Sequence, residues 1–232
     1  MTATQSAPSP PSLWIRRALV MLFVALASAS PVGAVDIQKL THDTQRTSQS
    51  SGQVTFVWWM PQAWWEASLN SNPSLTPEGR TQILAVLDEY LLFAILRAKM
   101  AGTGAIDARP KAEMLSNARL EIDGTNIDPI PPQDLAPTAQ AILLGVKPIL
   151  ASLLGKLGQG VEIVAYSGKR DGRRLLDAAQ PGSFRYTLYD ETFTWRLPLP
   201  SLLPAKFDPK TGDEFPGDYQ FNPYTGAPLS TK

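Results

Sequence analysis

Residues 53–60 limit the possible folds of this chain more than any other segment. They read Gln-Val-Thr-Phe-Val-Trp-Trp-Met, a β-branched and aromatic run that is typical of a strand, and Pro61 ends it. Side chains alternate between the two faces of a strand, so Trp58 points to one side and Trp59 to the other. Because both faces are largely apolar, we expect this strand to lie in the centre of a sheet.

Helices and strands alternate after this segment as far as residue 204. Thr76 is typical of a helix N-cap and Pro77 of the first helical position, and the apolar spacing from Ile83 to Leu91 continues the helix. A second, longer helix is predicted from Asp134 through residue 157. We also predict a helix over 62–69 and strands over 91–96, 113–123 and 160–167. Turns are predicted at Asp123–Gly124 and over 168–172, and a hairpin with strands 184–189 and 192–197.

Two of these predictions carry details that coordinates can test. The apolar run 91–96 is compatible with the end of the preceding helix, but the glycines at 102 and 104 favour a strand followed by a turn. Gly145 and Pro148 lie inside the long helix and predict a kink or a break there. Residues 53–204 therefore form a domain of the α+β class, with a mixed or antiparallel sheet and packed helices; a mixed α/β arrangement is the alternative.

Composition excludes several kinds of chemistry. The 232 residues include no cysteine and one histidine, and 21 Lys and Arg balance 21 Asp and Glu. Disulfides, thiolate nucleophiles, thiolate zinc sites and metal sites with several imidazoles are therefore excluded. A balanced charge argues against nucleic acid as a partner, because that binding relies on a cationic surface. We expect no metal, no cofactor and no nucleic-acid partner.

The first 34 residues are typical of a signal peptide. Arg16 and Arg17 precede an uncharged apolar run over 18–29, which is too short to span a bilayer, and small residues follow it up to Ala34. We predict export to the periplasm or out of the cell, with no stable membrane span after cleavage; an uncleaved membrane anchor is the alternative. Residues 35–52 are polar and are predicted to be a flexible linker, in which His42 is a solvated surface residue.

The C-terminal segment, residues 205–232, contains two similar turns. Residues 208–212 read Asp-Pro-Lys-Thr-Gly and residues 222–226 read Asn-Pro-Tyr-Thr-Gly, fourteen positions apart. The side chains of Asp208 and Asn222 can each accept a hydrogen bond from a backbone N–H two residues later, and Gly212 and Gly226 provide the positive φ that ends such a turn.

This segment resembles a zinc ribbon, whose two knuckles usually read Cys-Pro-x-Cys-Gly. The cysteines of that pattern would fall at Asp208, Thr211, Asn222 and Thr225, so the resemblance implies a small β-hairpin that has lost its metal. Oxygen atoms of Asp208 and Asn222 would then accept the N–H bonds that thiolates accept in the ribbon. Together with residues 195–204 and 56–61, the segment is similar to uncharacterised exported bacterial proteins whose ribbons keep their cysteines, which implies a common fold and no particular activity.

Three candidate sites follow from the residue types. Four tryptophans can form a binding platform for an envelope protein or a glycan, although aromatic residues in a strand and an adjacent helix are more often core; they are Trp58, Trp59, Trp64 and Trp65. Aromatic residues of the tail either dock it on the domain or stay exposed for a partner, and these are Phe207, Phe215, Tyr219, Phe221 and Tyr224. Acidic side chains can supply a carboxylate pair for hydrolysis of an envelope polymer, and these are Glu66, Asp88 and Glu89.

We therefore expect an exported protein with a non-catalytic binding or structural role in the cell envelope. A carboxylate-dependent hydrolase that acts on an envelope polymer is the alternative. The sequence itself offers no nucleophile elbow and no phosphate-binding loop, and its one histidine lies in the predicted linker.

Overall fold

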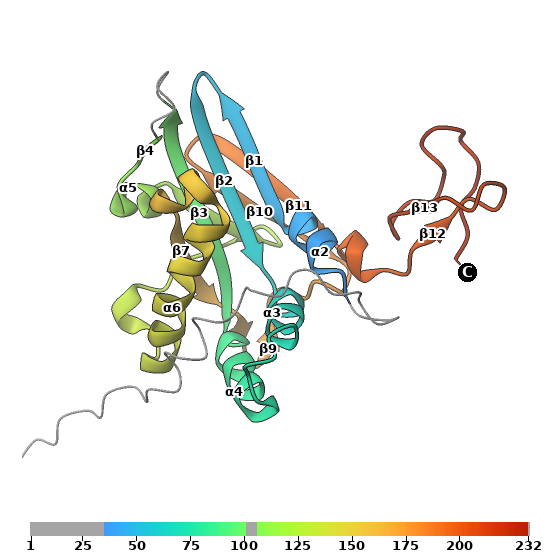
Figure 1. Ribbon diagram of the computed structural model, residues 1–232. Coiled ribbons are helices and arrows are strands. Elements are labelled where there is room, and N and C mark those ends of the chain that lie inside the picture. Colours follow the sequence, from blue (N-terminus) through green and yellow to red (C-terminus); the bar gives the residue numbers. More distant parts are fainter. Residues whose placement is uncertain (1–34, 101–105, 232) are drawn as a thin grey trace, which may run out of the picture.

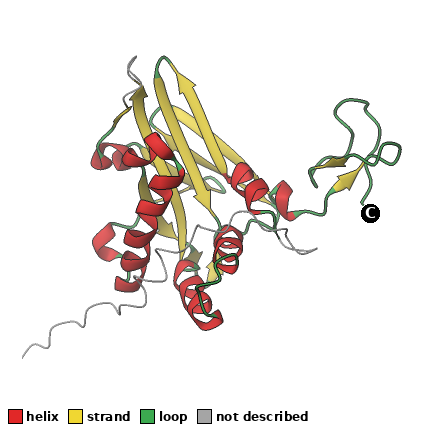
Figure 2. Ribbon diagram, viewed as in Figure 1, coloured by secondary structure: helices red, strands yellow, loops and turns green. Residues whose placement is uncertain are grey.

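The computed structural model describes residues 35–100 and 106–231, and its fold is of the α+β class, with helices packed on antiparallel sheets (Figures 1 and 2). The predicted signal peptide, residues 1–34, lies outside the described residues. The first sheet has five strands in the order β1-β2-β3-β4, with β7 also paired to β3. Its strands are β1 (Gln45–Ser50), β2 (Gln53–Met60), β3 (Tyr90–Met100), β4 (Ile106–Ala108) and β7 (Glu162–Ser167).

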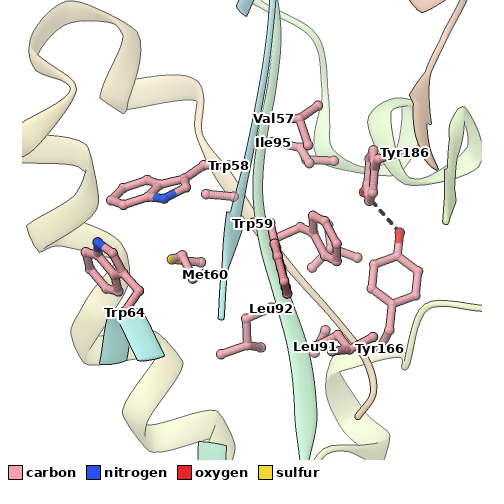
Figure 3. Packing of buried hydrophobic residues seen from close by; sticks show 14 of the residues in the cluster. Val57, Trp58, Trp59, Met60, Trp64, Leu91, Leu92, Ile95, Tyr166 and Tyr186 are labelled. Atoms are coloured by element: carbon pink, nitrogen blue, oxygen red, sulfur yellow. Dashed lines mark hydrogen bonds between the residues drawn. The ribbon is translucent and has the colours of Figure 1, made fainter. Parts of the chain in front are cut away.

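The strand over residues 53–60 lies inside this sheet, as its two apolar faces predict. It pairs with β1 on one side and with β3 on the other, and Trp59 stands opposite Phe93 in the register. Trp58 faces the helical layer, where its indole N–H donates to Oγ1 of Thr44 at 3.1 Å. Trp59 faces away from that layer and packs edge-on against Phe184 of a second sheet. Figure 3 shows Trp58 and Trp59 on the two sides of the strands.

The second sheet has four antiparallel strands in the order β11-β10-β5-β6. Its strands are β5 (Ala118–Ile122), β6 (Thr125–Ile127), β10 (Gly182–Leu188) and β11 (Glu191–Leu197). Aromatic rings fill the space between the sheets: Phe93 of the first sheet contacts Phe184 and Tyr186 of the second. The predicted hairpin over 184–189 and 192–197 is confirmed, with Leu188 opposite Glu191 across a two-residue connection.

Helices cover the other face of the first sheet (Figure 2). They include α2 (Ile37–Thr44), α3 (Gln62–Asn70), α4 (Pro77–Leu87) and α6 (Pro137–Leu153). The short helix α5 (Lys111–Ser116) leads into the second sheet instead, and the short 3-10 turns are η1 (Pro132–Asp134), η2 (Gly155–Gly160) and η3 (Pro200–Leu202). The predicted cap of α4 is confirmed, because Oγ1 of Thr76 accepts the Gly79 N–H at 3.1 Å. This helix ends at Leu87, so the apolar run that follows is the strand β3 rather than its last turns.

The predicted flexible linker over residues 35–52 is wrong. Asp36 caps α2 by accepting the N–H groups of Gln38 and Lys39, and Leu40 and Thr44 of this helix are fully buried. The next six residues form β1, an edge strand whose side chains are all half-buried or exposed, so it needs few apolar residues. A polar composition therefore hid two ordered elements, the helix α2 and the edge strand β1 of the first sheet.

Residues 113–123 also differ from the prediction of one strand. Their first part belongs to α5, and only 118–122 form the strand β5, which pairs with β6 and β10 and not with the strand over 91–96. The long helix α6 is shorter than predicted and runs unbroken past Pro148, whereas its end at Leu153 is followed by the 3-10 turn η2.

Three hairpins close through a two-residue turn that ends in glycine. Ser51–Gly52, Asp123–Gly124 and Asp171–Gly172 all have φ between +49° and +75°, as a type I′ turn requires at both central positions. The turn at Asp123–Gly124 was expected from the sequence, and the last of the three joins the two-residue strands β8 (Lys169–Arg170) and β9 (Arg173–Arg174). These turns fix the registers of β1 with β2, of β5 with β6 and of β8 with β9.

Candidate functional site

The tail, residues 205–231, is a small unit that projects from the rest of the fold (Figure 1). Its strands β12 (Lys206–Phe207) and β13 (Glu214–Phe215) are antiparallel, and single bridges pair Phe207 with Ser230 and Phe221 with Pro228. Because the tail has so few β-ladder hydrogen bonds, its conformation depends mainly on its turns.

The two turns of the tail have the same hydrogen bonds. Oδ1 of Asp208 accepts the N–H groups of Lys210 and Thr211 at 2.8 and 3.3 Å, and the Gly212 N–H donates to the Asp208 carbonyl at 2.8 Å. In the second turn Oδ1 of Asn222 accepts the N–H groups two and three residues later at 2.9 and 3.3 Å, and the Gly226 N–H closes the turn at 2.8 Å. Both glycines have positive φ, at 77° and 71°. The side-chain acceptor roles predicted for Asp208 and Asn222 are thus observed.

A direct side-chain bond joins the two turns. Nδ2 of Asn222 donates to Oδ2 of Asp208 at 2.7 Å, and the two residues are only 4% and 2% exposed. This bond, with the backbone N–H of Lys210, holds the pKa of the Asp208 carboxyl below its usual 3.8, because each donor favours the charged form. The carboxylate therefore stays ionised at neutral pH and binds both turns at once.

Thr211 and Thr225 were predicted from the sequence as residues of the two structural turns, but their own hydrogen bonds were not. Oγ1 of Thr211 accepts the Asp213 N–H at 3.3 Å and donates to the Asp213 carboxylate at 2.7 Å. Oγ1 of Thr225 accepts the Ala227 N–H at 3.3 Å. Threonine occupies the same position in both turns, and this repeat is the sequence signal for these hydrogen bonds. A threonine hydroxyl can accept a hydrogen bond from the backbone N–H two residues later.

Three aromatic side chains of the tail are exposed. Tyr219 is 39% exposed, Phe221 57% and Tyr224 88%, whereas Phe207 and Phe215 are partly buried. Of the two alternatives for the tail aromatics, docking on the domain therefore does not hold for these three, which stay exposed. Instead, Nζ of Lys39 binds Glu214 at 2.7 Å, and a Cβ on Gly217 would lie 2.4 Å from Cβ of Leu203, so the backbone packs closely there.

The four tryptophans proposed as a platform are all buried in the core, so they do not form an exposed binding surface. They are Trp58, Trp59, Trp64 and Trp65. Trp64 packs edge-on against both Trp58 and Trp65, and its indole N–H donates to Oγ1 of Thr41 at 2.8 Å. Helix α2, absent from the sequence prediction, supplies the hydroxyl acceptors for the indoles of Trp58 and Trp64. The indole N–H of Trp65 donates to the Met60 carbonyl at 3.1 Å instead.

Two of the acidic candidates, Glu66 and Asp88, are far apart in the sequence but lie at the same cavity. Glu66 and Asp88 line one cavity of about 200 Å³ beside the end of β2, with Asp177 and Arg174 at the same cavity. Asp88 is bound by Arg174 and by Lys169, and Glu89 also binds Lys169, so two of the three predicted carboxylates are engaged in ion pairs. His42 is exposed and lies 3.9 Å from Asp43.

The fold defines an α+β protein with a two-sheet core, a helical layer and an attached tail. No protein-family model matches the sequence, no curated protein matches it, and no solved structure matches the fold. Among residues 35–100 and 106–231, no group of three or more His, Asp or Glu side chains is placed to share a metal ion. Within the same residues, every helix is too short or too polar to cross a bilayer.

Proposed function

We propose that this protein is a non-catalytic binding protein of the cell envelope, and that its tail presents the binding face. The signal-peptide features of residues 1–34 support export to the periplasm or beyond. The observation that carries the proposal is the exposure of Tyr219, Phe221 and Tyr224 on a segment whose backbone is held by side-chain bonds.

The construction of the tail favours binding. Aromatic side chains, tyrosine in particular, are enriched in interfaces because they add a large contact area at a small cost in side-chain entropy. A segment that is already ordered loses less conformational entropy on binding than a flexible one. The tail meets both conditions, since Tyr224 lies within the turn that Asn222 and Gly226 close, and its own N–H donates to Oδ1 of Asn222.

A metal-free ribbon explains how such a short segment stays ordered. In our proposal, the bond between Asn222 and Asp208 takes the central place that a zinc ion has in a ribbon with cysteines, while Thr211 and Thr225 accept the N–H bonds of the second thiolates. The tail then needs neither metal nor cofactor.

The partner that fits this face is a protein with an apolar patch rimmed by basic residues. Residues 205–231 contain four acids and two lysines, and one of the acids, Glu214, is already paired with Lys39. Asp213 and Asp218 precede the exposed aromatic residues on the chain and carry the complementary charge.

Photo-crosslinking tests this proposal. A photoreactive phenylalanine analogue at position 224 is expressed in the native cell, and the protein that it captures is purified. We expect this protein to bind the wild-type chain and to bind the Phe221→Ala/Tyr224→Ala variant at least tenfold more weakly, with weaker binding in high salt. Leu144→Ala is the matched control, because Leu144 is 75% exposed but lies on α6. If the captured protein binds the double variant as well as wild type, or if nothing is captured, the tail is not the binding face.

A carboxylate-dependent hydrolase is the second candidate, because Glu66 and Asp88 share one cavity. Asp88 is already paired with Arg174 and Lys169. Glu66 would therefore have to be the carboxyl group that donates the proton in the reaction. Hydrolysis of purified peptidoglycan by wild type and its loss in Glu66→Gln would favour the enzyme. Equal release of products by wild type, Glu66→Gln and a protein-free blank would rule it out.

A further inference from the structure

The outer face of the second sheet carries a polar groove that the proposed tail surface does not involve. Leu120, Tyr186 and Leu188 point inward and are buried, so the residues between them on β5 and β10 point outward. A cavity of about 370 Å³ opens on this outward face, which is within the usual range for ligand pockets. It is lined by Asn117, Arg119, Glu121, Asn126, Thr187 and Tyr189.

Every residue that lines this groove has a hydrogen-bonding side chain. Ligand pockets are usually lined mainly by apolar side chains, so a lining of this kind selects a hydrophilic ligand. Amide, hydroxyl and carboxylate groups together offer donors and acceptors at short intervals, as the hydroxyl groups of a sugar require.

Two of these side chains have no partner among residues 35–100 and 106–231. The side chains of Arg119 and Asn126 are exposed and make no hydrogen bond or ion pair with any residue that the structure describes. Their neighbours are engaged: Glu121 binds Arg185, and Oγ1 of Thr187 is 2.9 Å from Oγ1 of Thr192. The groove therefore combines a neutralised carboxylate with an unpaired guanidinium, and its local charge is positive.

The base of the groove is held from behind. The hydroxyl of Tyr189 donates to Glu113 at 3.0 Å, and the guanidinium of Arg97 lies 5.4 Å from the centre of the Tyr189 ring. Nδ2 of Asn117 donates to the Glu113 carbonyl at 2.9 Å. These contacts fix the side chains before a ligand arrives, which lowers the entropy cost of binding.

We propose that this groove binds an acidic saccharide chain, with the guanidinium of Arg119 paired to a sugar carboxylate and Asn126 bonded to sugar hydroxyls. A guanidinium binds a carboxylate through two parallel hydrogen bonds, which gives both charge and orientation. The site is separate from the tail, so it stands whether or not the tail binds a protein.

Calorimetric titration of the whole protein tests this site. The probes are a galacturonate hexamer, a neutral galactose hexamer and free galacturonate. We expect the acidic hexamer to bind at least tenfold more tightly than the neutral one, more tightly than the monosaccharide, and more weakly as salt is raised. Equal affinity for the acidic and neutral hexamers would show that the charge of the ligand does not contribute to binding. Equal affinity for the acidic hexamer and free galacturonate would show that the groove does not bind a chain of several sugars.

Variants locate the binding on the groove. Arg119→Ala should lower the affinity for the acidic hexamer at least tenfold. Arg119→Lys should lower this affinity less, and Asn126→Ala should lower it about threefold. Arg196→Ala is the matched control, since this exposed arginine is on the same sheet but does not line the groove. Tyr224→Ala should bind the hexamer like wild type, which separates this site from the tail. Binding that survives Arg119→Ala unchanged, or no binding of the hexamer at millimolar concentration, would show that the groove is not a saccharide site.

Discussion

Nδ2 of Asn222 donates to Oδ2 of Asp208 over 2.7 Å, and through this bond each of two similar turns holds the other. The same carboxylate also accepts two backbone N–H groups of its own turn. The Asp208 carboxylate thus stabilises its own turn and also joins this turn to the second one. The order of residues 205–231 should depend on this pair more than on the short strands β12 and β13.

Asn222→Asp should open the tail. It places a second carboxylate against Asp208, so the donor is lost and two like charges lie at hydrogen-bond distance. We expect amide hydrogen exchange across residues 206–230 to become at least tenfold faster, measured by mass spectrometry of peptides from the tail.

The exchanged pair provides the control for this variant. Asp208→Asn combined with Asn222→Asp restores one donor and one acceptor in the same place, and each side chain keeps an oxygen for its own turn. Protection should return towards that of wild type in the double variant. Equal protection in Asn222→Asp and wild type would mean that the tail is ordered by other contacts.

The tail should also loosen in acid. The hydrogen bond from Asn222 and the Lys210 N–H hold the pKa of Asp208 below 3.8, so the folded tail favours the ionised carboxyl. The resulting stabilisation is complete above the unfolded pKa and is lost as pH falls through the lower, folded value. The ¹³C shift of the Asp208 carboxyl should therefore titrate below 3.8 in wild type and closer to 3.8 in Asn222→Ala. A titration at the same pH in both proteins would contradict this account.

Patterns that depend on local chemistry were predictable from the sequence. The alternation of residues 53–60, the cap at Thr76 and the turn at Asp123–Gly124 each reflect an interaction within a few residues, and all three are observed. The acceptor roles of Asp208 and Asn222 are of the same kind.

The errors arose where distant contacts decide the structure. Residues 37–44 are polar enough to look like a linker, yet Leu40 is fully buried and Thr44 receives the indole N–H of Trp58. That contact also explains why the tryptophans are core rather than a platform. Likewise, the bond from Asn222 to Asp208 crosses fourteen residues and could not be read from either turn alone.

Leu40→Ala tests the revised role of the N-terminal helix. Removal of a fully buried leucine side chain should lower the free energy of unfolding by about 2–5 kcal/mol, because burial is lost and a cavity remains. His42→Ala is the control on the same helix, and it should change stability by less than about 0.5 kcal/mol, since the His42 side chain is exposed. Urea unfolding followed by tryptophan fluorescence measures both. A loss as small as that of the control would indicate that α2 does not stabilise the core.

The hydroxyl groups of Tyr166 and Tyr186 lie 3.0 Å apart in the core between the two sheets (Figure 3). Tyr186→Phe should lower the free energy of unfolding by about 1–3 kcal/mol, because the Tyr166 hydroxyl is left buried without its partner. The double change to phenylalanine removes both polar groups and should cost less than the sum of the single changes. Additive losses in this cycle would mean that the two hydroxyls do not interact.

The Tyr166–Tyr186 pair should make the free energy of unfolding decrease as pH rises above about 10. Burial raises the pKa of Tyr166 to about 12, and burial raises that of Tyr186 well above its usual value of 10. Each folded pKa lies above the unfolded one, so the contribution to stability is complete below pH 10 and is lost as pH rises towards the folded values. Unfolding free energies measured between pH 8 and 11 should fall more steeply above pH 10 in wild type than in the doubly substituted protein, and parallel curves would place both phenols in contact with solvent.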